Sequence, residues 1–294
     1  MSVATLWVAL SYPRPVDRPA ISNPVDLRAW LATMTLEQER WLVGKLETQA
    51  LYGTKVRVVA NYSSAWLKVV VPDQPTPRDK RGYPGFVPAV QLTGTAPVSA
   101  ATTAIVRSPT AWVWSRWSAR GVTGRKLMEI SLDTRLPLVR ATNSYAVARL
   151  LGGRSVALKR GTVAPPHGRP SLASDTRRAR GRREEVPSPR LSVGRHVGLR
   201  LRLLRFQLFR VSRRGRGDPR DAGPQSTAGR PVNRSALLPA DLVFIRSRSS
   251  GPVVHVGLYI GDGYMLDAPH TGSPVRVEPV TASPYYAGAR HFVQ

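Results

Sequence analysis

The sequence predicts an α+β protein made of small domains in which short strands predominate. Short runs rich in Val, Leu, Ile and Trp recur between Pro, Gly and Asn, a pattern typical of strands joined by turns. Two segments near the start have apolar residues at three- and four-residue spacing, as amphipathic helices require. At 294 residues, of which 42% are hydrophobic, the chain is long enough for two or three domains that each bury a core.

Residues 1–95 are expected to form a β-rich domain with a helical insertion. Its strands and helices follow from the two periodicities, because strands alternate every second residue and helices repeat every three to four. The expected strands are residues 55–60 and 66–71, the expected helices are 24–31 and 36–46, and the expected core side chains are Trp30, Trp41 and Leu42.

Two further β-rich regions are expected. Residues 96–164 have β-prone runs at 103–106, 111–114, 135–139 and 155–158, which predicts a second small domain. Residues 218–294 again contain strand-like runs and tight turns, beginning with the run 241–245.

The stretch between these regions, residues 165–217, has a different composition. It contains fifteen Arg, no Lys and three acidic residues, and so carries much of the net charge of +26. Such a charge density opposes collapse, so we expect this stretch to be disordered. Basic runs also favour nucleic acid as a partner. Few aromatic side chains for base stacking accompany the charge, apart from Phe206 and Phe209, which makes nucleic acid an unfavoured partner.

Composition also excludes several classes of site. The chain contains no cysteine, which excludes disulfides and thiolate metal sites, and its five histidines are scattered, so no metal or other cofactor is expected. No apolar run is long enough for a membrane span. The N-terminus lacks a signal-peptide pattern, so the chain as written is expected in the cytoplasm. A misassigned start would allow secretion or a place in the cell envelope.

The stretch His255-Val-Gly-Leu-Tyr-Ile-Gly-Asp-Gly-Tyr-Met-Leu-Asp-Ala-Pro-His-Thr-Gly272 resembles the histidine half of an NlpC-type (NlpC/p60) cell-wall cysteine peptidase. Residues 74–88 resemble the end of a bacterial SH3-like barrel attached to such enzymes, and residues 96–164 look like a second barrel. The resemblance implies two SH3-like barrels followed by a papain-like α+β peptidase domain. It also implies hydrolysis of peptidoglycan stem peptides at the bond between γ-D-glutamate and the diamino acid.

The resemblance assigns catalytic roles to two residues. His255 matches the histidine that acts as base and then as acid, and Asp267 matches the third polar residue that orients it. Asp267 is alternatively a solvated carboxylate beside a turn. A three-residue hairpin loop at 261–263 would put both residues on one sheet face, whereas a two-residue loop at 262–263 would put them on opposite faces.

Other residues are candidates for binding. Tyr83 and Glu47 match positions that contact the free amino group of a stem peptide beginning with L-Ala, and His270 is placed beside the cleft. Their alternatives are structural, with Tyr83 as a barrel aromatic, Glu47 as a charge on a helix surface, and His270 as a loop histidine. Asp241 is expected to be a turn carboxylate, and His291 receives no role.

The nucleophilic cysteine of the resembled family is absent, and its expected place lies near Leu203 and Leu204. Arg without Lys, mixed with Pro, Gly, Ser and Leu, is typical of a GC-rich gene read out of frame. Shifting the frame by one base from Glu184 to Gln207 permits the translation KKFLRLAYLWGGTSGYGFDCSGF, which carries the family's Asp-Cys-Ser-Gly. We therefore hypothesise two compensating one-base errors. They would leave the chain inactive as written, and a catalytically dead module that binds wall fragments and a basic nucleic-acid-binding protein remain the alternatives.

Overall fold

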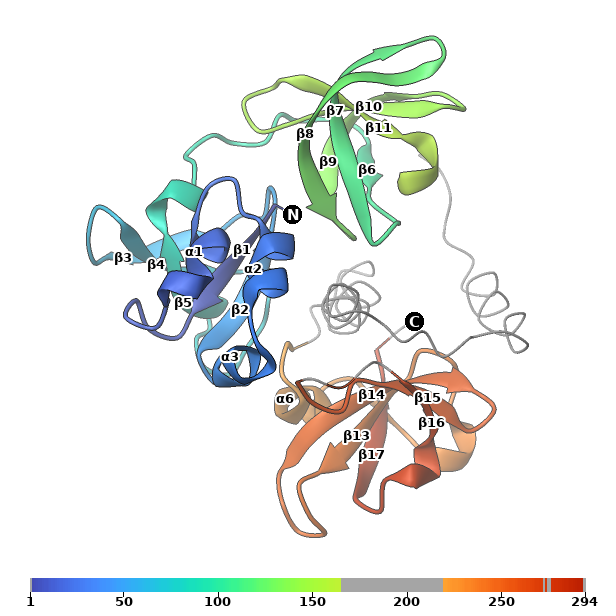
Figure 1. Ribbon diagram of the computed structural model, residues 1–294. Helices are drawn as coiled ribbons and strands as arrows, with labels where there is room; N and C mark the ends of the chain where they lie inside the picture. The colour runs from blue at the N-terminus through green and yellow to red at the C-terminus, as the bar shows by residue number, and fades with distance from the viewer. Residues whose placement is uncertain (1, 165–218, 272, 274–275, 293–294) are drawn as a thin grey trace. The chain divides into compact units, whose positions relative to one another are not determined.

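The computed structural model describes residues 2–164, 219–271, 273 and 276–292 (Figure 1). In these residues the chain has three antiparallel sheets, of five, six and six strands, together with short α-helices. Their internal contacts define two compact units, one with the first two sheets and one with the third. The fold class is therefore α+β, as predicted. The Arg-rich stretch 165–217, with Leu203 and Leu204, lies outside the described residues.

The first sheet has the strand order β2-β1-β5-β4-β3. Its core is formed by small and medium aliphatic side chains, including Leu6, Val69, Val71 and Val87. Val and Leu at alternate positions suit this packing, because successive side chains of a strand point to opposite faces. The strands are β1 (Val3–Trp7), β2 (Leu46–Leu51), β3 (Arg57–Asn61), β4 (Trp66–Val71) and β5 (Tyr83–Pro88).

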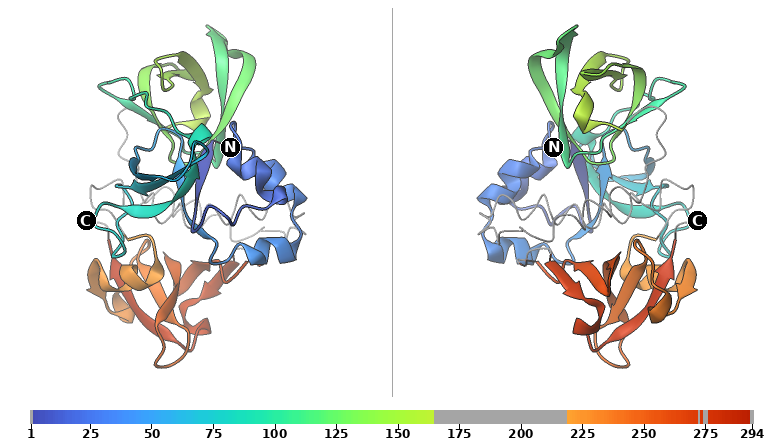
Figure 2. Two further views of the ribbon diagram at one scale, coloured as in Figure 1. Left: turned by 90° about the vertical axis from the view of Figure 1, so that its left-hand side faces the viewer. Right: turned by 90° about the vertical axis from the view of Figure 1, so that its right-hand side faces the viewer.

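The helical insertion lies between β1 and β2 and consists of α1 (Arg18–Ile21), α2 (Leu27–Thr33) and α3 (Leu36–Trp41). Figure 2 shows these helices, in blue, gathered at one side of the strands of their unit. The predicted helix over 36–46 is too long. Gly44 adopts a left-handed conformation with φ of 75°, which ends the helical path, and Leu46 already begins β2.

The predicted core residues of the insertion divide into two groups. Trp30 and Leu42 are buried, as expected. The prediction that Trp41 is buried is wrong, because 38% of this residue is exposed. Helix α3 contains no buried residue, so its last residue remains at the surface. There the guanidinium of Arg14 lies 4.1 Å from the centre of the Trp41 ring, a cation–π contact.

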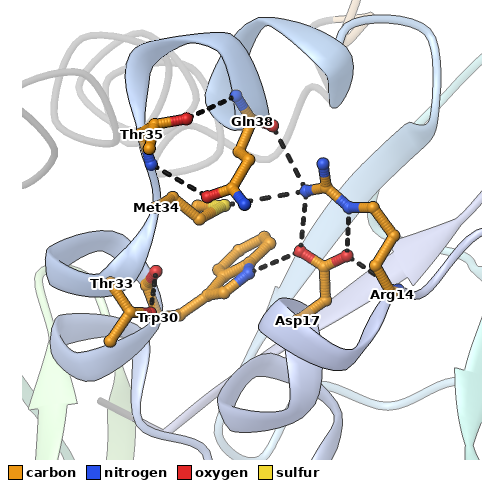
Figure 3. Close-up of polar contacts among 7 residues, drawn as sticks. All are labelled: Arg14, Asp17, Trp30, Thr33, Met34, Thr35 and Gln38. Carbon is orange, nitrogen blue, oxygen red and sulfur yellow. Dashed lines mark hydrogen bonds and ion pairs between the residues drawn. The ribbon is translucent and has the colours of Figure 1, made fainter.

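A buried carboxylate connects the insertion to the chain that enters it (Figure 3). Asp17 is fully buried and accepts hydrogen bonds from Arg14 Nε at 2.8 Å and Trp30 Nε1 at 2.8 Å. Burial would raise the pKa of Asp17, but the hydrogen bonds from Arg14 and Trp30 outweigh it and lower the pKa. Arg14 Nη2 also donates to the backbone oxygen of Gln38 at 3.2 Å, so one ion pair joins α2, α3 and the entering chain.

The second sheet has the order β6-β9-β10-β11-β7-β8. Its core consists of aliphatic side chains, of which Val113, Ile130, Val156 and Leu158 are fully buried. The long hairpin β7–β8 dominates this sheet and extends from it in Figure 1. The strands are β6 (Thr103–Ile105), β7 (Thr110–Ser118), β8 (Gly121–Ser131), β9 (Arg135–Ala141), β10 (Tyr145–Arg149) and β11 (Ser155–Lys159).

The third sheet has the order β12-β17-β13-β14-β15-β16 and buries apolar side chains on both faces. Leu242, Phe244 and Leu258 pack on one face with Ala222 of helix α6. Val243, Tyr259 and Met265 pack on the other. The elements are α6 (Ala222–Thr227), β12 (Arg230–Val232), β13 (Leu242–Arg246), β14 (Val253–Gly261), β15 (Tyr264–Asp267), β16 (Arg276–Pro279) and β17 (Tyr286–His291).

Candidate active site

His255 lies near the start of β14, where its neighbours on the sheet are fixed by pairing. It stands directly opposite Ile245 of β13, a residue that packs with the Val243, Tyr259 and Met265 cluster. Directly paired residues of an antiparallel sheet point to the same face. His255 therefore projects from the Met265 face of the sheet, and 25% of its side chain remains exposed.

The loop that joins β14 to β15 contains two residues, Asp262 and Gly263. Gly261 pairs with Tyr264, and the two residues between them have φ of 54° and 79°. Positive φ at both central positions is the requirement of a type I′ hairpin turn, which favours Asp-Gly. For a two-residue loop, the sequence pattern predicted that His255 and Asp267 would lie on opposite faces of the sheet.

A β-bulge at Ile260 reverses that expectation. Tyr259 pairs with Met265 but Gly261 pairs with Tyr264, so Ile260 has no partner of its own in β15. One extra residue in a strand shifts the register by one and moves every following side chain to the other face. With this shift Asp267 falls opposite Gly257, two residues from His255 and on the same face.

The two side chains meet. Nε2 of His255 donates a hydrogen bond to Oδ1 of Asp267, whose side chain is 2% exposed. Gly257 contributes to this contact, because a glycine opposite Asp267 places no side chain between the carboxylate and the imidazole. A Cβ at Gly257 would lie only 2.6 Å from the sulfur of Met265, so any other residue there would displace the Met265 side chain.

Two charged residues of β16 extend the site. Asp267 pairs with Arg276 across the sheet, and Arg276 Nε lies 3.4 Å from Asp267 Oδ2. Arg276 Nη2 in turn lies 2.6 Å from Glu278 Oε2. Sequence reasoning missed both residues, since Arg276-Val-Glu278 has the ordinary alternation of a half-exposed strand and only the pairing of β15 with β16 brings them to Asp267.

These contacts set the protonation of the two carboxyl groups. Burial would raise the pKa of Asp267, but the hydrogen bond from His255 and the positive charges of His255 and Arg276 outweigh it and lower the pKa. Burial and the nearby charge of Asp267 raise the pKa of Glu278. The site therefore holds Asp267 as the anion, which keeps the imidazole of His255 oriented.

The candidate binding residues belong to other elements of the chain. His270 is exposed, and its ring contacts the hydroxyl of Ser273 and the backbone of Thr271 in its own loop. Tyr83 and Glu47 belong to the first unit, on β5 and β2, and both are buried. The alternative placing Glu47 on a helix surface is wrong, because Glu47 follows the first residue of a strand that packs beside β1.

Gly85 lets β5 and β2 approach each other at Glu47. A Cβ at Gly85 would meet the Cβ of Leu6 at 2.7 Å and the Cβ of Glu47 at 3.4 Å. The backbone of β5 is therefore packed against the Glu47 position, in the same unit as Tyr83.

The structure contains a second histidine–carboxylate pair. His291 Nδ1 lies 2.5 Å from Oδ1 of Asp241, which is 1% exposed and also accepts a hydrogen bond from the backbone N–H of Leu238 at 2.8 Å. The expectation of a turn carboxylate holds for Asp241, since Ala240 before it has φ of 94°. The pairing with His291, to which the sequence assigned no role, was missed.

The two pairs are separated along the sheet. Asp241 aligns with Tyr259 and His255 with Ile245, so the two pairs are four residue steps apart along β14, roughly 13 Å at ~3.3 Å per residue. Among the described residues, no group of three or more His, Cys, Asp or Glu is arranged to hold a metal ion. In the same part of the chain, no helix is long and apolar enough to cross a membrane.

Comparison with known proteins places the chain in a family. A model of the NlpC/P60 family matches residues 207–293. A γ-D-glutamyl-L-lysine dipeptidyl-peptidase of Bacillus cereus is 37% identical over 306 aligned residues, which cover 100% of this chain and 90% of the relative. The enzyme of the same name from Bacillus subtilis is 31% identical, over 97% of this chain and 93% of its own.

A solved structure agrees with the sequence relatives. The crystal structure of an NlpC/P60 family protein from Bacillus cereus superposes with a TM-score of 0.78 at 31% identity and covers 100% of this chain and 98% of its own. Similarity of this extent, in sequence and in fold, reaches well beyond the histidine region. The chain belongs to the NlpC/P60 family of peptidases.

Proposed function

We propose that this fold supports hydrolysis of peptidoglycan stem peptides at the γ-D-glutamyl bond to the diamino acid, with His255 and Asp267 as its remaining catalytic pair. The observation that carries the proposal is the contact between the His255 imidazole and the buried Asp267 carboxylate. The names of the two Bacillus relatives supply the substrate class. We propose the same bond as the target of this chain because the chain belongs to the same family as these relatives.

In the proposed reaction a cysteine thiolate attacks the γ-carbonyl carbon of D-glutamate. The carbon–nitrogen bond breaks, the imidazolium of His255 gives its proton to the leaving amine, and a thioester remains. Water then attacks the thioester carbon while His255 takes the proton of that water. The carbon–sulfur bond breaks, which releases the γ-carboxyl group of D-glutamate and regenerates the thiolate. Because Asp267 accepts from Nε2, Nδ1 is the nitrogen of His255 assigned to proton transfer.

The chain supplies no thiol for this reaction, since it contains no cysteine. We propose that two compensating one-base shifts replaced the nucleophile segment, within residues 165–217. Removing the nucleophile of such a site typically costs several orders of magnitude in rate, so the chain as written is expected to be inactive. Rereading the nucleotide sequence across these codons tests the frameshift, and a gene with no cysteine-encoding alternative frame would contradict it.

The catalytic proposal is tested by restoring the frame. A gene shifted by one base after codon 164 and returned to frame before codon 219 encodes a chain with the Asp-Cys-Ser-Gly segment. Three purified proteins are compared on the tripeptide L-Ala-γ-D-Glu-L-Lys: the chain as written, the restored chain, and the restored chain with His255→Ala. Cleavage is expected only from the restored chain with His255. Cleavage by the chain as written, or by the His255→Ala protein at an undiminished rate, would refute the assignment.

A second function, binding without cleavage, is favoured by the absence of cysteine. Tyr83 and Glu47 are the residues proposed for the amino group of the stem peptide, where a carboxylate beside an ammonium forms a strong hydrogen bond. Calorimetry of the chain as written with the same tripeptide measures this function. No heat at millimolar ligand would dismiss it.

A further inference from the structure

The outer face of the second sheet carries an aromatic stripe on β7. Ala111 and Val113 are buried in the core of that sheet, and the residues between and beside them, Thr110, Trp112 and Trp114, point away from it. Trp112 is 40% exposed. Large aromatic side chains left partly in water mark ligand or partner surfaces when they gather in one place.

A pocket lies along this stripe. Its volume is about 260 Å³, and it is lined by Trp112, Trp114, Thr110, Lys126, Lys159 and Thr162, among others. Pockets for drug-sized ligands usually measure ~300–1,000 Å³. The pocket therefore suits a ligand about the size of a single substituted ring.

Lysines flank the tryptophans on both sides. Lys126 of β8 stands opposite Trp114, with its Nζ 4.8 Å from the centre of the Trp112 ring and 5.6 Å from that of Trp114. On the other side, Ala157 of β11 pairs with Trp114, and the same register brings Lys159 beside Trp112. The ammonium groups thus lie at opposite rims of one aromatic surface.

One acidic residue shares this face, but its charge is already paired. Glu129 stands opposite Trp112, is 5% exposed, and accepts hydrogen bonds from Arg28 at 2.8 and 2.6 Å. Burial would raise the pKa of Glu129, but the contacts with Arg28 and Thr110 outweigh it and lower the pKa. The lysines of the pocket therefore face solvent with their positive charge uncompensated by Glu129.

We propose that this pocket binds a saccharide ring that carries a carboxylate. Indole faces offer flat apolar walls to the C–H faces of a sugar ring, the threonine hydroxyls suit its polar edge, and the lysines complement the charge. The inference rests on the proposed function, because release of a stem peptide with a free amino group leaves N-acetylmuramic acid in the wall polymer with a free carboxylate. The carboxylates of the stem peptide are the other source of the same charge.

The test uses the full chain as written and isothermal titration with three ligands: N-acetylmuramic acid, N-acetylglucosamine, and L-Ala-γ-D-Glu-L-Lys. N-acetylmuramic acid is expected to bind about tenfold more tightly than N-acetylglucosamine, since the two rings differ in the carboxylate that the lysines recognise. Trp112→Ala is expected to weaken binding of N-acetylmuramic acid by about tenfold or more. Lys126→Met is expected to abolish the preference between the two sugars.

Trp41→Ala is the matched control. Trp41 is exposed to a similar extent, at 38%, and also contacts a cation, but it lies in the helical insertion of the first sheet. Equal binding of the two sugars, or equal losses from Trp112→Ala and Trp41→Ala, would overturn the proposal. Trp112-dependent binding of the tripeptide in place of the sugar would overturn the ligand class. Cleavage of the free tripeptide by the frame-restored chain is expected to be unchanged by Trp112→Ala, which separates this inference from the catalytic one.

Discussion

Asp267 reaches His255 because a single bulged residue shifts the register of the hairpin between them. The two-residue loop at Asp262 and Gly263 would by itself send the carboxylate to the far face. The bulge at Ile260 returns it to the face of the imidazole. The geometry of the proposed catalytic pair thus depends on one residue that is left without a partner in β15.

Deleting Val256 should separate the pair, whereas deleting Ile260 should not. Without Ile260, Tyr259 still pairs with Met265, next to the pair of Gly261 with Tyr264, so Asp267 stays opposite Gly257 and on the face of His255. Without Val256, His255 becomes the neighbour of Gly257 and points to the other face. The imidazole NMR signals of His255 are expected to move, and the frame-restored chain to lose most of its activity, only in the Val256 deletion. Unchanged His255 signals in that variant would contradict the register argument.

Asp267→Asn should destabilise the third-sheet unit in a pH-dependent way. The substitution leaves the buried site without its charge-assisted contacts to His255 and Arg276, a loss of about 1–3 kcal/mol at neutral pH. Since folding lowers the pKa of Asp267 below its ordinary value of 3.8, its stabilisation is fully present above that value. It is lost as pH falls through the folded pKa.

Urea unfolding of the two proteins between pH 7 and pH 2 measures this difference. The free energies of unfolding are expected to converge in the acid range. A difference that stayed constant down to pH 2 would show that the Asp267 charge does not contribute.

The two histidine–carboxylate pairs should respond differently to mutation. His291→Ala leaves Asp241 buried without that partner and is expected to cost about 1–3 kcal/mol of stability. In the frame-restored chain it should leave kcat per folded molecule nearly unchanged. His255→Ala should abolish that activity, and thermal unfolding with turnover assays on both variants separates the roles. A loss of turnover from His291→Ala equal to that from His255→Ala would refute the distinction.

Gly85→Ala should destabilise the first sheet. The added Cβ would lie 2.7 Å from the Cβ of Leu6, and overpacking of this kind typically costs ~1–3 kcal/mol. Gly94→Ala is the control, because a Cβ there would meet no atom within 4 Å. Thermal unfolding compares the two, and equal melting temperatures would show that β5 shifts at no cost.

Local sequence patterns predicted the strands more reliably than the limits of the helices. The strand expected at 66–71 is β4, because Val, Leu and Trp in short runs specify an extended conformation through nearby packing. The helix expected over 36–46 stops at Trp41. The apolar spacing of the sequence continues beyond it, but the left-handed conformation of Gly44 interrupts the helix. The prediction that Trp41 is buried was wrong for the same reason, because the exposure of Trp41 depends on where the helix ends.

The sequence by itself determined the α+β class, the family resemblance around His255 and the lack of a thiol. Composition and short-range spacing are sufficient for these. Only the tertiary structure decided that Asp267 faces His255, that Arg276 holds its other oxygen and that His291 meets Asp241. These contacts join different strands of the third sheet, and their register depends on an unpaired residue at Ile260. A one-residue shift leaves the local pattern unchanged while it reverses every side chain beyond it.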